Sequence, residues 1–209
     1  MALVLHGLEV SVYTRVVRMA LALKGVQYRL ELANPFETPP DGRVSATGRI
    51  PVLEHDGFIL SETAAIVDYL DAEFPEPRLR PEGAAAIGRS AQVRGIVDSA
   101  GYWPMVRQVF SHGVFQPLRG QPADPPEVAE GLAASAPVLA ALEQIAEEGH
   151  VLNRTRLTQA DLHLGPMIAY FAMEPRGRAA LDRNPALARW FDWMAHQPCF
   201  ERTDPGLRR

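Results

Sequence analysis

The sequence contains very little cysteine and lysine, and both shortages narrow the classes of protein that it can encode. Cys199 is the one cysteine among 209 residues, so a single chain cannot form a disulfide, a CxxC redox pair or a thiolate zinc site. Such a chain suits a reducing compartment. Lys24 is the one lysine, and the remaining basic residues are scattered arginines in a chain of net charge −4. This pattern argues against nucleic-acid binding, which needs basic residues clustered on one face.

Long apolar runs are also missing from the sequence. No run approaches the roughly 18 residues that cross a bilayer, and residues 1–6 lack the basic start of a secretory leader. We therefore expect a cytoplasmic protein with no membrane partner. Hydrophobic residues make up 47% of the chain, which is typical of a globular protein with a real core.

The hydrophobic period changes several times within the first third of the chain. Residues 2–6 form a short apolar run that predicts a buried strand. Apolar positions then recur at helical spacing over residues 12–23, with Ser11 as the candidate N-cap and Gly25 at the stop position. Residues 27–32 alternate as a strand does. The order strand, helix, strand predicts a βαβ unit.

The following residues predict a ββα unit and then a change of architecture. Short strands at residues 51–54 and 58–60 flank an Asp-Gly turn, and residues 61–74 have helical periodicity. Prolines and Gly83 then cluster, as in an interdomain linker. Everything beyond has helical periodicity. The fold class is therefore α/β plus all-α, with a domain at residues 1–78, a linker at 79–86 and a helical bundle at 87–209.

Three small features lie at strand ends of the first domain, and each has a simple structural alternative. Ser11 and the N–H groups at the start of its helix favour a thiolate, although a serine there commonly just caps the helix. Pro51 opens a strand, and a cis bond before it would leave the backbone of Ile50 free to pair with a peptide; an ordinary trans proline is the alternative. Glu62 and Thr63 begin a helix and suit an α-amino acid group, although an acid stabilises any helix start.

Together these features suit three parts of one tripeptide, and the surrounding motifs resemble a known family. The chain is similar to the cytosolic glutathione S-transferases. The resemblance is carried by Val4-Leu5-His6-Gly7, by Gly48-Arg49-Ile50-Pro51-Val52-Leu53, by Leu60-Ser61-Glu62-Thr63-Ala64-Ala65 and by the capping box Leu157-Thr158-Gln159-Ala160-Asp161-Leu162.

The resemblance implies a fold, an activity and partners. The expected fold is a thioredoxin-like domain followed by a C-terminal helical bundle. The expected reaction adds the glutathione thiolate to an apolar electrophilic small molecule, with glutathione as co-substrate, no other cofactor and no metal. The family also implies a homodimer.

Carried over to this chain, the resemblance implies roles for individual residues of the first domain. Ser11 would activate the sulfur, and Tyr13 could share or take that role. Position 6 is histidine where many members have tyrosine, and position 11 is not cysteine, which argues against thiol exchange. The predicted glutathione-binding residues are Arg49, Ile50, Pro51, Glu62, Thr63 and Arg43.

The electrophile is expected to meet an aromatic and apolar stretch of the bundle. The candidates are Tyr102, Met105, Val106, Val109 and Phe110, and packing inside the bundle is the alternative role for each. Two other functions stay open: a glutathione-dependent isomerase, dehalogenase or peroxidase, and a non-catalytic binding or interaction protein on the same scaffold.

Overall fold

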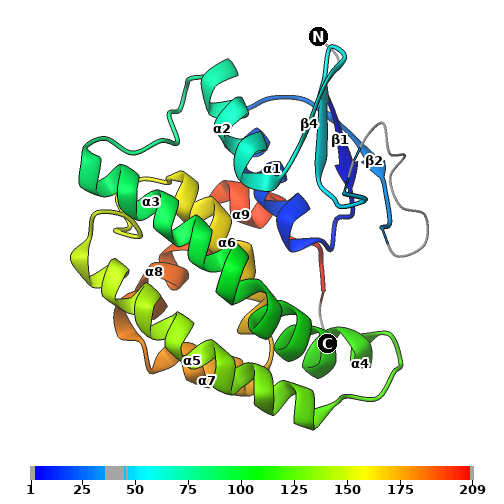
Figure 1. Cartoon of the computed structure of the whole chain (residues 1–209), viewed down its shortest axis with the longest axis vertical. Helices are drawn as coiled ribbons and strands as arrows, with labels where there is room; N and C mark the ends of the chain where they lie inside the picture. Colours follow the sequence, from blue (N-terminus) through cyan, green and yellow to red (C-terminus); the bar gives the residue numbers. More distant parts are fainter. Residues whose placement is uncertain (1–2, 36–44, 46, 208–209) are drawn as a thin grey trace. The chain divides into compact units, whose positions relative to one another are not determined.

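Four short strands near the start of the chain form one mixed sheet with the order β2-β1-β3-β4. The strands are β1 (Leu3–Gly7), β2 (Arg29–Leu32), β3 (Val52–His55) and β4 (Phe58–Ser61) in a computed structural model that describes residues 3–35, 45 and 47–207 (Figure 1). Strand β1 pairs in parallel with β2 and antiparallel with β3, which pairs antiparallel with β4. The predicted βαβ-ββα order is confirmed.

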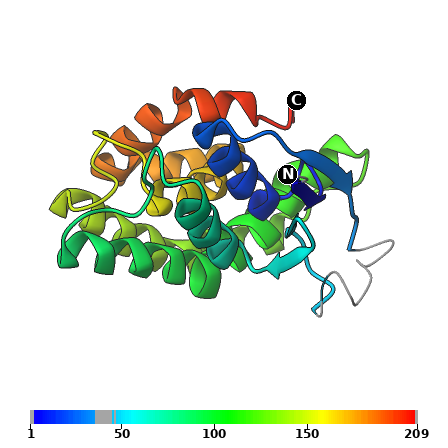
Figure 2. The ribbon, with the colours of Figure 1, turned by 90° about the horizontal axis from the view of Figure 1, so that it is seen from above.

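Helices α1 (Val12–Lys24) and α2 (Thr63–Glu73) pack against each other, and α2 also contacts β3 and β4 (Figures 1 and 2). Both bury the apolar stripes that the sequence predicts. Helix α1 ends at Gly25, whose φ of 67° is the left-handed conformation that glycine adopts most readily. The short helix α9 (Pro198–Arg202) packs on α1. The chain from Pro198 therefore belongs to the same compact unit as the sheet, together with the residues up to Leu79.

Lys24 joins three segments of this unit through a fully buried side chain. Its ammonium donates to the Asp71 carboxylate at 2.8 Å, to the Phe74 carbonyl at 2.6 Å and to the Pro77 carbonyl at 3.0 Å. Three acceptors match the three donors of an ammonium group, so the buried charge is fully hydrogen-bonded. The sole lysine of the chain is therefore a structural residue.

The second unit, Arg80–Gln197, is helical, as predicted. Helix α6 is buried along nearly its whole length, and it contacts α3, η2 and α8; α5 packs along η2 and α8. Segments η1 and η2 are π-helical, so each backbone N–H bonds to the carbonyl five residues earlier instead of four. An example is the bond from the Tyr102 N–H to the Val97 carbonyl. The helices are α3 (Ala84–Ile96), η1 (Val97–Gly101), η2 (Trp103–Phe115), α4 (Gln116–Leu118), α5 (Pro125–Glu148), α6 (Gln159–Phe171), α7 (Pro175–Asp182) and α8 (Pro185–Ala195).

Helix α5 is, among the described residues, the one helix long and apolar enough to cross a membrane by length and composition. Its mean hydropathy reaches 1.2 over the most apolar window, of which 39% is buried within the structure. Core helices of water-soluble proteins pass the same test, and α5 packs along η2 and α8. The finding is therefore weak support for a membrane span.

The start of α6 carries the capping box that the sequence predicts. The Asp161 carboxylate accepts hydrogen bonds from the Thr158 N–H at 2.8 Å, from the Thr158 hydroxyl at 2.5 Å and from the Trp190 indole at 2.7 Å. Burial raises the pKa of the Asp161 carboxyl, although these hydrogen bonds act in the opposite direction. One fully buried carboxyl group thus satisfies three donors and links α6 to α8.

We expect Asp161→Ala to lower the free energy of unfolding of the helical unit by about 3–5 kcal/mol, because three buried donors lose their acceptor. All three tryptophans lie in this unit, so urea unfolding followed by tryptophan fluorescence reports on it directly. The matched control is Asp182→Ala, which removes an exposed pair with Arg178 and should cost below about 1 kcal/mol. Equal losses in the two variants would contradict this role for Asp161.

Candidate functional site

Ser11 caps α1 at the end of the loop that leaves β1. Its Oγ accepts a hydrogen bond from the Thr14 N–H at 3.3 Å. A hydroxyl has two acceptor lone pairs and one donor, so capping leaves its O–H available to a ligand. The structural and the functional interpretation of Ser11 are therefore compatible.

Gly7 allows the first turn of α1 to lie close to the end of β1. A Cβ atom built on Gly7 would lie 2.4 Å from the Oγ1 of Thr14, a side chain that is fully buried. No other residue type fits this approach without a shift of α1. The close contact fixes where the Ser11 end of α1 meets the sheet.

Glu62 caps α2 in a backbone conformation that non-glycine residues rarely adopt. Its φ is 69° and its ψ is 117°, and its side chain makes no capping hydrogen bond. The side chain is exposed, while the adjacent Thr63 is buried. The Glu62 carboxylate and the first N–H groups of α2 therefore remain available to a ligand.

Ile50 and Arg49 belong to a tight turn just before β3. The Ser45 Oγ accepts a hydrogen bond from the Arg49 N–H at 3.1 Å and donates one to the Arg49 carbonyl at 3.0 Å. Among the described residues, no hydrogen bond engages the backbone N–H or C=O of Ile50, and its bond to Pro51 is cis. Ser45 is 3% exposed, and its spacing from Arg49 suits such a turn, although no sequence motif marks it.

The strand register brings these features to one edge of the sheet. Val52, the first residue of β3, pairs with His6 near the end of β1 and with Ser61 at the end of β4. The loop to Ser11 follows β1, the turn at Ile50 precedes β3, and Glu62 follows β4. All three therefore lie beside the ends of adjacent strands. A carboxylate, a hydroxyl, an unpaired peptide backbone and two helix starts share this edge.

Two of the predicted residues have a less defined place. Tyr13 lies half-buried in the first turn of α1. Arg43 lies outside the described residues. His6, which stands where many members have tyrosine, lies on the sheet between two carboxylates, 3.2 Å from Glu31 and 3.6 Å from Glu54.

Four of the predicted electrophile residues lie in η2 of the helical unit, and Tyr102 lies at the junction between η1 and η2. The Phe110 ring stacks on Tyr170 at 4.3 Å, and Val109 lies close to Gly131 of α5, so both pack inside the unit. Tyr102 is half-buried, and Trp103 beside it is 62% exposed. The residues of the set that are buried are Met105, Val106, Val109 and Phe110.

The single thiol of the chain is poorly suited to chemistry. Cys199 is buried, and burial raises the pKa of its thiol. Among the described residues, no group of three or more His, Cys, Asp or Glu side chains is arranged to hold a metal ion. The polar groups at the sheet edge are therefore the candidates for binding and catalysis.

Comparison with known proteins relates the chain to the glutathione S-transferases. The family model of the glutathione S-transferase N-terminal domain matches residues 5–78. A glutathione S-transferase of Triticum aestivum is 34% identical over 97 residues, which are 46% of each chain. A maleylacetoacetate isomerase of Pseudomonas aeruginosa is 30% identical over 197 residues, which are 90% of this chain and 89% of that one.

Solved structures agree with the fold of both units. The crystal structure of a glutathione transferase from Populus trichocarpa matches with a TM-score of 0.83 over 100% of both chains, at 23% identity. The Pseudomonas aeruginosa relative extends over both the sheet and the helices, and the family model covers the segments that carry Ser11, Ile50 and Glu62. The chain therefore belongs to the cytosolic glutathione S-transferase family of enzymes.

Proposed function

We propose that this protein is a glutathione transferase that adds the glutathione thiolate to an apolar electrophile. The observation that carries the proposal is the register of Val52, which sets Ser11, Ile50 and Glu62 beside adjacent strand ends. Glutathione is a tripeptide with a thiol in its middle residue, and each of these groups suits one part of it. The hydroxyl suits the thiol, the free backbone suits the cysteinyl peptide, and the carboxylate suits the γ-glutamyl ammonium. Membership of the family supports the same assignment.

Ser11 stabilises the thiolate in this proposal. Its O–H donates to the sulfur, and the start of α1 favours negative charge. A free thiol with a pKa of about 8.5 is a few per cent ionised at pH 7, and a depression of about two units corresponds to about 2.7 kcal/mol. The fraction of reactive thiolate then rises roughly thirtyfold. Holding the electrophile beside the sulfur supplies the rest of the acceleration.

The other residues hold the two ends of the peptide. The Glu62 carboxylate pairs with the γ-glutamyl ammonium, while Thr63 and the first N–H groups of α2 bind the neighbouring carboxylate. Ile50, before Pro51, pairs its backbone with the cysteinyl residue. Arg49 flanks the peptide, and Arg43, which lies outside the described residues, is the candidate partner of the glycyl carboxylate.

The electrophile contacts the helical unit at the stretch of Tyr102, Met105, Val106, Val109 and Phe110. Of these, Tyr102 is partly exposed and can contact a ligand, and the neighbouring Trp103 is exposed and can enlarge that contact surface. The four buried residues shape the packing beneath. Glutathione is the co-substrate, and the proposed chemistry needs no metal. We place the protein in the cytoplasm.

A glutathione-dependent isomerase is the second candidate, because the relative that matches 90% of this chain is a maleylacetoacetate isomerase. In such a reaction the thiolate adds to the substrate, a bond rotates, and the thiolate leaves again. Conjugation consumes one thiol per turnover, whereas isomerisation returns it. The thiol count after turnover therefore separates the two.

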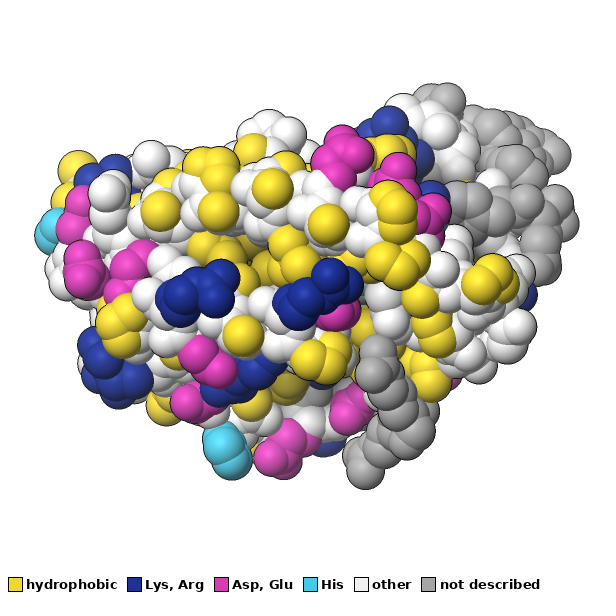
Figure 3. Space-filling model, turned by 90° about the horizontal axis from the view of Figure 1, so that it is seen from below, with side chains coloured by type: hydrophobic (Ala, Val, Ile, Leu, Met, Phe, Trp, Pro, Cys, Tyr) yellow, Lys and Arg dark blue, Asp and Glu magenta, His cyan; other side chains and the backbone are white. Residues whose placement is uncertain are grey.

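We infer that the chain pairs as a homodimer, which the family and the exposed apolar side chains both support. Phe58 and Ile59 on β4 are 50% and 40% exposed. On the face seen in Figure 3, hydrophobic side chains gather around a hollow, with arginine and acidic side chains beside them. Such surfaces mark contacts between proteins more often than free surface.

Sedimentation equilibrium should give twice the chain mass of 23.0 kDa for the wild type. Phe58→Glu should shift the protein toward monomer, because burying an unpaired charge in an apolar contact is unfavourable. Leu32→Glu is the matched control, since Leu32 is 77% exposed on β2 at the opposite edge of the sheet. A monomeric wild type would refute the homodimer.

Glutathione should bind the wild type in calorimetric titration, and Glu62→Ala should weaken that binding roughly tenfold or more through loss of the ammonium partner. Glu62→Gly should lose the same affinity while keeping or raising thermal stability, since glycine accepts a positive φ without strain. Glu73→Ala, at the other end of α2, is the control. Unchanged affinity for glutathione in both Glu62 variants would contradict the assigned pocket. A folded wild type that does not bind millimolar glutathione would refute the transferase proposal.

Ser11→Ala should raise the pKa of bound glutathione, read from the ultraviolet absorbance of its thiolate, and slow conjugation at pH 7 roughly thirtyfold. Ser11→Thr keeps the hydroxyl and should keep most of the effect, and Tyr13→Phe should leave the pKa unchanged. If Tyr13→Phe raises the pKa and Ser11→Ala does not, the phenol of Tyr13 is the donor.

A further inference from the structure

The loop between β1 and α1 is short, and hydrogen bonds fix both of its ends. At the sheet end, the Gly7 carbonyl accepts a hydrogen bond from the Ala33 N–H at 3.2 Å, so Gly7 continues the pairing of β1 with β2. At the helix end, the Ser11 N–H donates to the Leu8 carbonyl at 3.0 Å, and the Ser11 carbonyl accepts from the Arg15 N–H at 2.9 Å. The position of Ser11 is therefore set by where the first turn of α1 meets the sheet.

That meeting point is a direct contact between Gly7 and Thr14. A Cβ atom on Gly7 would lie 2.7 Å from the Cγ2 of Thr14 and 3.1 Å from its Cβ, and closer still to its Oγ1. Carbon atoms in contact lie about 3.5–4.0 Å apart, so an added Cβ would push the first turn of α1 away by about 1 Å. Thr14 is fully buried, and a β-branched side chain in a helix has few rotamers, so it cannot turn aside.

Thr14 also carries the N–H group that Ser11 caps. The Ser11 Oγ accepts a hydrogen bond from this N–H at 3.3 Å. The Oγ1 of Thr14, in contrast, is buried and has no hydrogen-bond partner among the described residues. A buried hydroxyl without a partner is unfavourable, so hydrogen bonding does not account for a threonine at this position. The Thr14 side chain therefore acts here through its shape, in the contact with Gly7.

The two ends of the candidate site have separate supports. Thr14 contacts the end of β1 with its side chain and the Ser11 hydroxyl with its backbone. A displacement of Thr14 would therefore move the partner of that hydroxyl. The turn at Ile50 and the start of α2 at Glu62 are placed instead by β3 and β4. A change at Gly7 should thus affect the thiolate end of the site more than the end that holds the peptide.

We propose that Gly7 and Thr14 are positioning residues for the glutathione reaction, because their close contact holds the Ser11 hydroxyl within hydrogen-bond distance of the sulfur. The inference rests on the proposed function of Ser11. Hydrogen bonds weaken steeply with poor geometry, and a misplacement of about 1 Å can change a reaction rate about a hundredfold. Gly7 and Thr14 are both buried, so they act through Ser11 rather than on glutathione itself.

The test measures the pKa of bound glutathione from the ultraviolet absorbance of its thiolate. Gly7→Ala should raise this pKa by about one unit, which lowers the thiolate fraction at pH 7 severalfold. The affinity for S-methylglutathione, which has no thiol to ionise, should stay unchanged. Gly7→Ala combined with Ser11→Ala should have the same pKa as Ser11→Ala alone, because Gly7 acts only through that hydroxyl.

A size exchange separates positioning from a general loss of stability. Thr14→Ala removes the two atoms closest to the added Cβ, so Gly7→Ala with Thr14→Ala should recover most of the wild-type pKa. Gly7→Ala with Thr14→Val keeps the branched shape and should not recover it. Gly25→Ala is the matched control: it strains the other end of α1, where φ is 67°, and should lower the Tm without changing the pKa.

Three results would overturn the inference. The first is an unchanged pKa in folded Gly7→Ala when Ser11→Ala raises it, which would leave the proposed function standing. The second is a further rise when Gly7→Ala is added to Ser11→Ala. If Gly7→Ala does not fold, the third is a double variant with Thr14→Ala that is no closer to the wild-type pKa than Thr14→Ala alone. A wild type that does not lower the pKa of bound glutathione would instead refute the thiolate stabilisation of the proposed function.

Discussion

The pairing of β3 with both of its neighbours is the constraint on which the candidate site depends. Val52 faces His6 across one ladder and Ser61 across the other, so the ends of three strands are fixed side by side. A slip of one residue would turn every side chain of β3 to the other face of the sheet. Such a slip would put the part-exposed Glu54 carboxylate in the place of the fully buried Leu53, which is unfavourable. The chemistry at the sheet edge is thus set by packing beneath it.

The loops at this edge are held in place by interactions that cost local freedom. Gly7 has no side chain, which allows Thr14 to lie close to it. Ser45 is hydrogen-bonded to Arg49 across the turn, and Glu62 has a positive φ. Strained or tightly bonded backbone of this kind is found where a ligand must be met in a fixed geometry. The same unit balances its buried charge at Lys24 with three acceptors, which leaves no ionic group of that contact available for catalysis.

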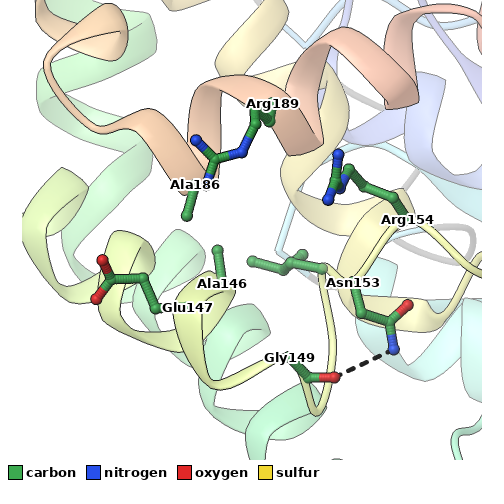
Figure 4. Close-up of a pocket in the computed structure, with 8 residues that line it drawn as sticks. Ala146, Glu147, Gly149, Asn153, Arg154, Ala186 and Arg189 are labelled. Atoms are coloured by element: carbon green, nitrogen blue, oxygen red, sulfur yellow. Dashed lines mark hydrogen bonds between the residues drawn. The ribbon is translucent and has the colours of Figure 1, made fainter.

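The helical unit follows a different principle. Its central helix α6 is buried along most of its length, and Asp161 joins it to α8 through three hydrogen bonds. Most of the aromatic stretch that suggested a substrate surface is packed against this core, as the stacked Phe110 and Tyr170 rings show. An open depression occurs instead at the far end of α5 (Figure 4). An apolar stripe at helical spacing therefore does not distinguish core from pocket.

The order of the elements, the βαβ-ββα pattern and the helical second half were determined by the sequence, because hydrophobic period and turn residues are local signals. Ser11, Ile50 and Glu62 could be found in the same way, since each stands where the period changes. Local signals gave no sign of helix α7, of Ser45 in the turn or of the strain at Glu62. Tertiary structure alone decided which strand ends meet and which apolar residues of η2 are buried. These depend on contacts between residues far apart in the chain, which no short pattern records.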